Sequence, residues 1–319
     1  MFLPLRGKKL PEIRHIYALS PDSTDWNRLE KEGFTLVSTE SSDYEKTLLS
    51  AQEILVSDIS DSSLAPLLSK VSLQQRIIFL QHGIIRNQIW RWLNSRRIDV
   101  LLTSTDRETA EIIGDGTHYT LSSPEVWQTG LPRHDALKQL RAMSTPKDVL
   151  LIAPTWSPKI RHKIPGTTID SWINDWTQWV ANISTLNLVP VFFLHPNMEE
   201  AFAESNITPS IPVIRGNQVQ EFLARAAVVV TDRSSIVNEG HFIGVPGVLV
   251  APESDPLSFK LRDKYLDSGF ILVDDFAELP SAVKHAVADD VTRFRQPADL
   301  PPEPSCEKLV SLILETRFE

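Results

Sequence analysis

The sequence has almost no cysteine. Its 319 residues include one, Cys306, so the chain cannot form a disulfide within itself. No group of cysteines and histidines has the spacing of a zinc site either. A chain of this length can bury a core large enough for stability without such cross-links. The scarcity of cysteine fits a reducing compartment.

Positive charge is also in short supply. The chain has 32 lysines and arginines against 41 aspartates and glutamates, a formal net charge of −9. Non-specific binding of nucleic acid needs a basic footprint, so we expect no nucleic-acid partner. The acidic balance argues equally against a strong polybasic membrane anchor.

Long apolar runs are missing as well. No run approaches the roughly 18 residues that a membrane-spanning helix needs. Residues 1–10 are too few and too polar to act as a signal peptide. Apolar runs such as Val189–Leu194 and Ala226–Val230 have the length of strands. We therefore expect a cytoplasmic protein of ordinary composition, with 42% hydrophobic and 23% charged residues.

What the sequence does have is an alternation of strand-like and helix-like segments. Stretches such as Asp25–Glu32 and Asp43–Gln52 are polar and compatible with helix. Alternation of this kind predicts a parallel sheet with helices on both faces, a doubly wound Rossmann-like domain. The strands expected in the first half are Arg14–Leu19, Phe34–Ser38, Glu53–Ser57, Arg76–Leu80, Val100–Thr103 and His118–Leu121.

The same pattern starts again after Met143. A short polar linker with a proline, Ser144–Asp148, precedes the next strand, and we place the domain boundary at 142–147. We expect an N-terminal domain over 1–143, a second α/β domain over 144–300, and a last helix within 301–319 that packs back on the first domain. The fold class is therefore α/β, with two doubly wound domains facing a central cleft. The strands expected in the second half are Val149–Ala153, Leu188–Leu194, Pro212–Ile214, Ala227–Thr231 and Gly247–Val250.

Candidate functional residues lie in five short segments that the alternation of strands and helices places at strand ends. In open α/β sheets, ligands bind beyond the carboxyl ends of the strands. His82 in Gln81–Gly83 suits proton transfer near neutral pH, and Arg133 in Thr129–Asp135 stands near a predicted helix start, where it suits a phosphate. Thr155 in Ala153–Trp156 opens a loop that also carries several cations.

The other two segments are His195-Pro196 and Thr231–Ser235. Proline fixes the turn after His195, so the imidazole is held in place. Thr231, Ser234 and Ser235 end an apolar strand at a predicted helix start, where free N–H groups attract an anion. Taken alone, each histidine is more simply explained as part of a turn, Arg133 fits either reading, and Thr231–Ser235 favours an anion site. The clustering at strand ends favours a ligand site.

In these residues and their order the sequence resembles the CDP-glycerol glycerophosphotransferases that build teichoic acid and some capsule polymers. That family has a His-Gly after a strand, a Thr-Gly-x-Pro-Arg-x-Asp turn and an Ala-Pro-Thr-aromatic loop. A His-Pro step and a Thr-Asp-x-Ser-Ser helix start follow, with an acid five residues after the first serine. Here that acid is Glu239. The resemblance covers about two thirds of the chain, from Ile77 to Val250.

The resemblance implies a GT-B architecture, no metal at the site and no cofactor. It implies transfer of a polyol phosphate from CDP-glycerol or a similar CDP-polyol to a polymer or lipid-linked acceptor, with peripheral contact to the inner face of the membrane. His82 and His195 are the catalytic candidates. His82 is the general base, and His195 helps to hold the donor phosphates. The remaining implied donor ligands are Arg133, Thr155, Thr231, Ser234 and Ser235 for phosphate, and Glu239, Arg215 and Gln218 for the nucleoside.

The chain also departs from the family pattern. Ser157 stands where the family often has arginine, and Arg161 is the candidate replacement. Ile84 follows the His-Gly pair, where the family tends to have proline. Two other readings therefore stay open. One is a GT-B glycosyltransferase or sugar-nucleotide epimerase that uses a nucleotide sugar, and the other is a non-catalytic nucleotide-binding protein. The sequence does not determine the oligomeric state.

Overall fold

The chain forms two compact units. The computed structural model describes residues 14–23, 25–59, 64–85, 88–216, 218–254, 262–263, 265–288 and 304–316. Unit 1 comprises Met1–Asp135 and Asp299–Glu319, and unit 2 comprises Ala136–Ala298. The boundary expected at 142–147 thus differs from the division in the structure, which falls inside helix α6 (Pro132–Met143). Helix α6 therefore crosses the boundary without a break.

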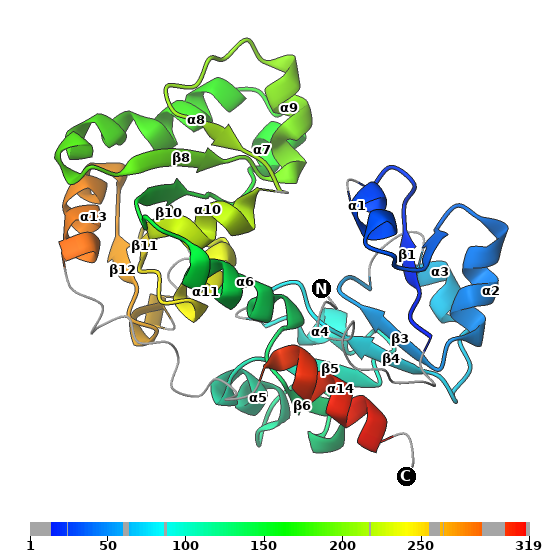
Figure 1. Cartoon of the computed structure of the whole chain (residues 1–319). Helices are drawn as coiled ribbons and strands as arrows, with labels where there is room; N and C mark the ends of the chain where they lie inside the picture. The colour runs from blue at the N-terminus through cyan, green and yellow to red at the C-terminus, as the bar shows by residue number, and fades with distance from the viewer. Residues whose placement is uncertain are drawn as a thin grey trace. The chain divides into compact units, whose positions relative to one another are not determined.

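Unit 1 contains two parallel sheets (Figure 1). Strand β1 pairs with β2, and a four-stranded sheet has the order β3-β4-β5-β6. Its elements are β1 (Tyr17–Leu19), α1 (Trp26–Lys31), β2 (Leu36–Ser38), α2 (Ser42–Ser50), β3 (Glu53–Val56), α3 (Ala65–Leu68), β4 (Arg76–Phe79), α4 (Trp90–Leu93), β5 (Val100–Thr103), α5 (Asp106–Ile113), η2 (Ser123–Glu125), β6 (Val126–Gln128), α6 and α14 (Ser305–Glu315).

The strand expected at His118–Leu121 is wrong. This stretch is irregular, and the fourth strand of the sheet is β6 instead. The side chain of Asn94 donates to the carbonyl of His118 at 2.8 Å and accepts from the N–H of Thr120 at 3.2 Å. Backbone groups that bond to a side chain in this way are not available for a ladder between strands.

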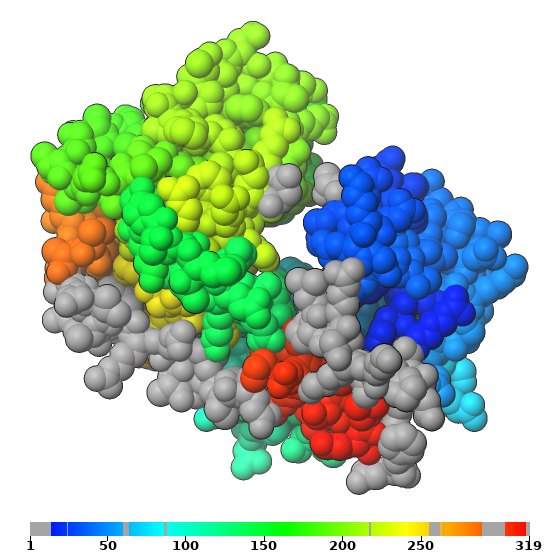
Figure 2. Space-filling model, viewed as in Figure 1, coloured from blue at the N-terminus to red at the C-terminus, as the bar shows by residue number. Residues whose placement is uncertain are grey.

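The four-stranded sheet is buried on both faces because its side chains alternate. Phe79 and Leu101 pack on one face with residues of α4 and α5. Ile78 and Leu102 point to the other face, where they pack against Leu309 of α14. The last helix thus covers a sheet face that a crossover helix covers in a fully doubly wound domain. Its outer side forms part of the surface seen in Figure 2, in red.

The start of α14 is held by a carboxylate from α6. Asp135 accepts the backbone N–H groups of Ser305 at 2.9 Å and of Cys306 at 2.8 Å. A negative charge at the first turn of a helix satisfies free N–H groups and interacts favourably with the helix dipole. Burial, with a contribution from Asp135, raises the pKa of the Cys306 thiol to about 12. Asp135, part of the Thr129–Asp135 turn, therefore has a structural function in unit 1.

We expect Asp135→Ala to lower the free energy of unfolding by about 1–2 kcal/mol, the usual cost of removing a helix cap. Two N–H groups at the start of α14 lose their acceptor, and Cys306, 1% exposed in the wild type, becomes accessible more often. Urea denaturation and the rate of thiol labelling at pH 8 measure the two effects. Asp115→Ala, at an exposed site on the same unit, is the control. Unchanged stability and labelling in Asp135→Ala would refute the capping function.

Unit 2 has one six-stranded parallel sheet of order β12-β11-β10-β7-β8-β9. The chain begins at β7 in the middle, adds β8 and β9 on one side, and then returns to add β10, β11 and β12 on the other. Its elements are β7 (Val149–Ile152), α7 (Pro158–Arg161), α8 (Ile169–Thr177), η3 (Gln178–Leu186), β8 (Val189–Phe193), η4 (Pro196–Met198), α9 (Glu199–Glu204), β9 (Val213–Ile214), α10 (Val219–Arg225), β10 (Ala226–Thr231), α11 (Ile236–Phe242), β11 (Gly247–Val250), β12 (Ile271–Val273), η5 (Phe276–Glu278) and α13 (Leu279–Ala288).

This strand order is that of a Rossmann domain, and its direction reverses between β7 and β10. Every residue of β7 is buried, because helices cover both faces of the sheet. Strand β12 was not expected from the sequence, because three residues are too few to stand out as an apolar run. The α/β prediction with parallel sheets is confirmed for both units.

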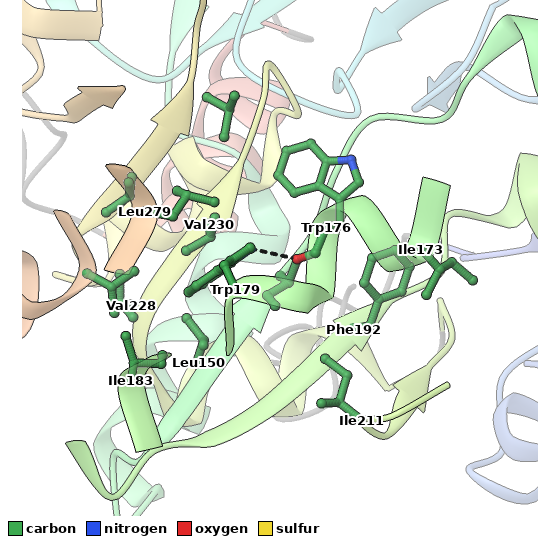
Figure 3. Packing of buried hydrophobic residues seen from close by; sticks show 14 of the residues in the cluster. Leu150, Ile173, Trp176, Trp179, Ile183, Phe192, Ile211, Val228, Val230 and Leu279 are labelled. Carbon is green, nitrogen blue, oxygen red and sulfur yellow. Dashed lines mark hydrogen bonds between the residues drawn. The ribbon is translucent and has the colours of Figure 1, made fainter. Parts of the chain in front are cut away.

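A core of aromatic and branched residues covers one face of the unit 2 sheet (Figure 3). Trp176 lies in the last turn of α8, and Trp179 lies in the 3₁₀ helix η3 that follows. The indole Nε1–H of Trp179 donates to the carbonyl of Trp176 at 2.8 Å, shown as a dashed line. Both rings are thus buried with the one polar group of Trp179 satisfied, which anchors η3 on the sheet.

Candidate functional site

The loops after β7 and β10 are joined by hydrogen bonds at the carboxyl edge of the unit 2 sheet. The hydroxyl of Thr231 donates to the carbonyl of Ala153 at 2.7 Å. The backbone N–H of Thr155 donates to Oδ1 of Asp232 at 2.8 Å. These two bonds cross the point at which the strand order reverses, the place where α/β sheets bind ligands.

Thr155 has a hydroxyl that the fold leaves without a partner. Its Oγ1 is buried and has no hydrogen-bond partner among the described residues. A buried hydroxyl without a partner costs free energy, so such groups in native proteins call for an explanation. Thr155 lies at the β7–β10 reversal, where the strand order of the sheet changes direction.

The serines after β10 lie at the start of α11, as the sequence predicted. Ser234 is half-buried and Ser235 is exposed. Neither serine caps the helix with a close side-chain hydrogen bond. The N–H of Ile236 lies 3.5 Å from the hydroxyl oxygen of Ser234. Helix α11 itself has seven residues, beginning at Ile236, and Glu239 is half-buried in its first turn. The hydroxyls of both serines remain suited to donate to an anion.

His195 follows β8, the strand next to β7. Its Nδ1 accepts the backbone N–H of Asn197 at 3.1 Å. A neutral imidazole has one N–H, so the hydrogen must be on Nε2. Burial, and next the positive charge of Arg161, lower the pKa of His195 below its ordinary value of 6.5. At pH 7 His195 is therefore neutral and offers an Nε2–H donor, which suits a phosphate ligand better than a base.

We expect the pKa of His195, followed by NMR titration of its ring nitrogens, to lie below 6.5, so that the ring becomes cationic at lower pH than a free histidine. Arg161→Gln removes the second cause and raises this pKa part of the way. It stays below 6.5 because burial is the larger cause. Lys159→Gln, also in α7, is the control for loss of a cation. A His195 pKa that Arg161→Gln leaves unchanged contradicts the electrostatic contact.

Arg215 and Gln218 lie in the loop after β9, the edge strand beside β8. Both are exposed, and the side-chain oxygen of Gln218 accepts the N–H of Arg215 at 3.2 Å. The guanidinium of Arg215 also approaches Glu199 at 3.9 Å. The candidates of unit 2 thus lie at or after the ends of four neighbouring strands of one sheet, β10, β7, β8 and β9. They are Thr155, Thr231, Ser234, Ser235, His195, Arg215 and Gln218.

His82 belongs to unit 1, directly after β4. Its Nδ1 lies 3.2 Å from the carbonyl oxygen of Ser57. A carbonyl only accepts, so in the neutral ring Nδ1 carries the hydrogen and Nε2 has a free lone pair. The ring is exposed. This is the tautomer opposite to that of His195, and it suits a general base.

Arg133 is half-buried at the first turn of α6, after β6. His82 and Arg133 follow strands that lie two apart in the order β3-β4-β5-β6 of unit 1. The structure thus brings His82 and Arg133 to one sheet edge of unit 1, and the remaining candidates together at one edge of unit 2.

Three features of these sites were missed by sequence reasoning. They are Ser57, whose carbonyl orients His82, Asp232, which bridges two loops, and Glu108, whose buried carboxylate contacts the loop of His82. Asp232 had a signal in its position within Thr231–Ser235. Glu108 had no signal that linked it to His82, because Gln81 and Ile85 lie 27 and 23 residues before it in the sequence.

Comparison with known proteins decides the family. The model of the family described as CDP-Glycerol:Poly(glycerophosphate) glycerophosphotransferase matches residues 1–293. The chain belongs to this family. The match confirms the resemblance seen in the motifs and identifies the protein as a CDP-glycerol glycerophosphotransferase-like enzyme.

Solved structures show the same fold. The wall teichoic acid polymerase TagF matches with 15% identity and a TM-score of 0.64, over 97% of this chain and 82% of that chain. A variant of the polymerase soaked with CDPG matches with 15% identity and a TM-score of 0.64, over 99% and 83%. The UDP-GlcNAc 2-epimerase of Methanocaldococcus jannaschii, in complex with UDP-GlcNAc and UDP, matches with 17% identity and a TM-score of 0.60, over 94% and 98%. These are GT-B proteins, so the GT-B fold is established. No curated protein matches the sequence.

One departure from this glycerophosphotransferase family has a structural counterpart. Ser157 replaces the frequent family arginine, while the guanidinium of Arg161 lies over the ring of Trp156 at 5.3 Å and acts on His195. Arg161 therefore supplies a cation to the same group of loops. Within the described residues, no cluster of three or more potential metal ligands occurs and no helix is long and apolar enough to cross a bilayer.

Proposed function

We propose that the enzyme transfers glycerol phosphate, or a related polyol phosphate, from a CDP-linked donor to a hydroxyl of a polymer or lipid-linked acceptor, and releases CMP. The observation that carries the proposal is the bridged pair of loops after β7 and β10 in unit 2, with the unpartnered hydroxyl of Thr155. The family supports this reaction class, and the structure of the teichoic acid polymerase with CDPG supports a CDP-linked donor.

In this proposal unit 2 binds the donor. The hydroxyls of Thr155, Ser234 and Ser235 and the Nε2–H of His195 contact the donor phosphates. The hydroxyl of Thr231 is buried and donates to the Ala153 carbonyl, so in this proposal Thr231 joins the two loops and does not contact phosphate. Glu239 accepts from the ribose, and the loop of Arg215 and Gln218 flanks the base. These hydroxyl and imidazole donors are uncharged. Together with the N–H groups before α11 they stabilise the negative charge of the phosphates, and they do not accept the proton that the acceptor hydroxyl loses.

In the reaction, the acceptor oxygen bonds to the distal phosphorus while the bond from that phosphorus to the CMP oxygen breaks. The acceptor proton passes to the free lone pair of His82 Nε2, and CMP leaves with the electrons of the broken bond. Arg133 stabilises the negative charge of the phosphates. Positioning and charge stabilisation supply most of the rate enhancement in phosphoryl transfer.

The test is a donor screen by calorimetry, with CMP release as the second readout. We expect binding of CDP-glycerol or CDP-ribitol and no binding of UDP-GlcNAc. Asp232→Ala, which leaves the N–H of Thr155 without its acceptor, weakens donor binding about 10-fold or more. Asp232→Asn keeps an acceptor oxygen and is the matched control. Binding of UDP-sugars alone would overturn the proposal.

A second candidate is a nucleotide-sugar enzyme, because the structural similarity extends to a UDP-GlcNAc 2-epimerase. In the same screen, this candidate predicts selective binding of UDP-GlcNAc and no release of CMP. Cytidine selectivity excludes it.

A further inference from the structure

A buried carboxylate in unit 1 contacts the segment that carries His82. Glu108 is the third residue of α5 and is 3% exposed. Its Oε1 accepts the backbone N–H of Ile85 at 2.9 Å and the side-chain Nε2–H of Gln81 at 3.2 Å. Its Oε2 accepts the backbone N–H of Ser104 at 2.6 Å. The carboxylate therefore joins the loop after β4 to the loop after β5.

The two contacts from the first of these loops lie on either side of His82. Gln81 precedes the histidine and Ile85 follows it by three residues, so both ends of the segment bond to one oxygen. A fixed segment gives its side chains a fixed direction, which is what the contact between His82 Nδ1 and the Ser57 carbonyl requires.

Gln81 is itself in a strained conformation that needs support. Its φ is +59°, in the left-handed region that costs a residue other than glycine roughly 1 kcal/mol or more. The buried amide of Gln81 donates to the carbonyl of Leu102 as well as to Glu108. Strain of this kind persists only where the surroundings hold it, and here Glu108 provides part of that hold.

Only a carboxylate suits this position. All three neighbours are N–H donors, and an ionised glutamate is acceptor-only at both oxygens. A glutamine has one oxygen and one NH₂ group. Whichever way its amide is oriented, the NH₂ group faces either Ser104 N–H or the pair from Gln81 and Ile85.

We propose that Glu108 is a positioning residue for His82: its carboxylate fixes the 81–85 segment and thereby the tautomer and direction of the imidazole. The expected effect of Glu108 on turnover rests on the proposed function, whereas its expected effect on the tautomer and direction of His82 does not.

The test compares Glu108→Gln with Glu111→Gln, an exposed acid on the same helix. We expect Glu108→Gln to lower kcat about 10–100-fold, since a displacement of about 1 Å costs on that order, with KM and calorimetric Kd for CDP-glycerol within about twofold. Long-range ¹⁵N–¹H spectra are expected to show His82 with its hydrogen on Nδ1 in the wild type and a mixture of both tautomers in Glu108→Gln.

Glu108→Asp keeps the charge and provides a second folded variant, with an expected intermediate loss of kcat because the shorter carboxylate does not reach all three donors. The proposal is overturned if Glu108→Gln keeps wild-type turnover and an unchanged His82 spectrum, or if turnover and donor affinity fall together with the melting temperature in both variants. Should the wild type release no CMP from any donor, the proposed function fails, while the His82 spectra still decide the position of Glu108.

Discussion

His82→Ala is expected to lower turnover by about 10²–10⁴-fold, the usual contribution of a positioned general base. The reason is the free lone pair on Nε2, which follows from the contact of Nδ1 with the Ser57 carbonyl at 3.2 Å. Without it the acceptor hydroxyl has no group to accept its proton in the transition state. CMP release under saturating CDP-glycerol measures the effect.

Donor binding is the internal control for this result. The donor ligands proposed above belong to unit 2 apart from Arg133, so we expect the calorimetric Kd of His82→Ala to stay within about threefold of the wild type. His118→Ala, an exposed histidine of the same unit, is the matched variant and should keep full activity. Near wild-type turnover in His82→Ala would remove His82 from the mechanism.

Trp179→Ala is expected to lower the free energy of unfolding by about 3–5 kcal/mol, the range for deleting a large aromatic side chain from a core. Trp179 is 4% exposed and packs in the cluster of Figure 3 between η3 and the sheet. Its removal leaves a cavity in the cluster that contains Leu150 of β7 and Val228 of β10. The loops after these two strands are the ones proposed above to bind the donor. Chemical denaturation measures the loss.

Trp179→Phe separates packing from hydrogen bonding. The phenyl ring keeps most of the buried volume but cannot donate to the Trp176 carbonyl, so we expect a smaller cost that includes about 1 kcal/mol for the lost bond. If Trp179→Ala changes stability by less than 1 kcal/mol, this part of the cluster is not essential to unit 2.

The fold was largely predictable because strand and helix signals in an α/β protein are local. The runs at Val149 and Ala226 are apolar throughout, as buried parallel strands are, and both are central strands of unit 2. The prediction failed at His118–Leu121, where the apolar and β-branched residues are real but Asn94 bonds to the backbone. It also missed β12, which is short.

The site was predictable to the extent that it depends on strand ends. His82, His195 and Thr155 were found because each directly follows an apolar run. Their assignments as base, phosphate donors and nucleoside ligands stay predictions. The tautomers of His82 and His195 depend on backbone groups that no local pattern identifies.

The sequence by itself determined the class of fold and the family, and it predicted the strand ends at which candidate residues lie, because these follow from periodicity and ordered motifs within short windows. Only the tertiary structure decided that α14 covers the unit 1 sheet, that Asp232 joins two loops and that Glu108 contacts the His82 segment. The physical reason is the separation in sequence of the residues that interact. The pattern of apolar residues is read from neighbours in sequence, whereas these hydrogen bonds join residues that lie 23 to 77 positions apart. Helix α14 packs on strands that are more distant still.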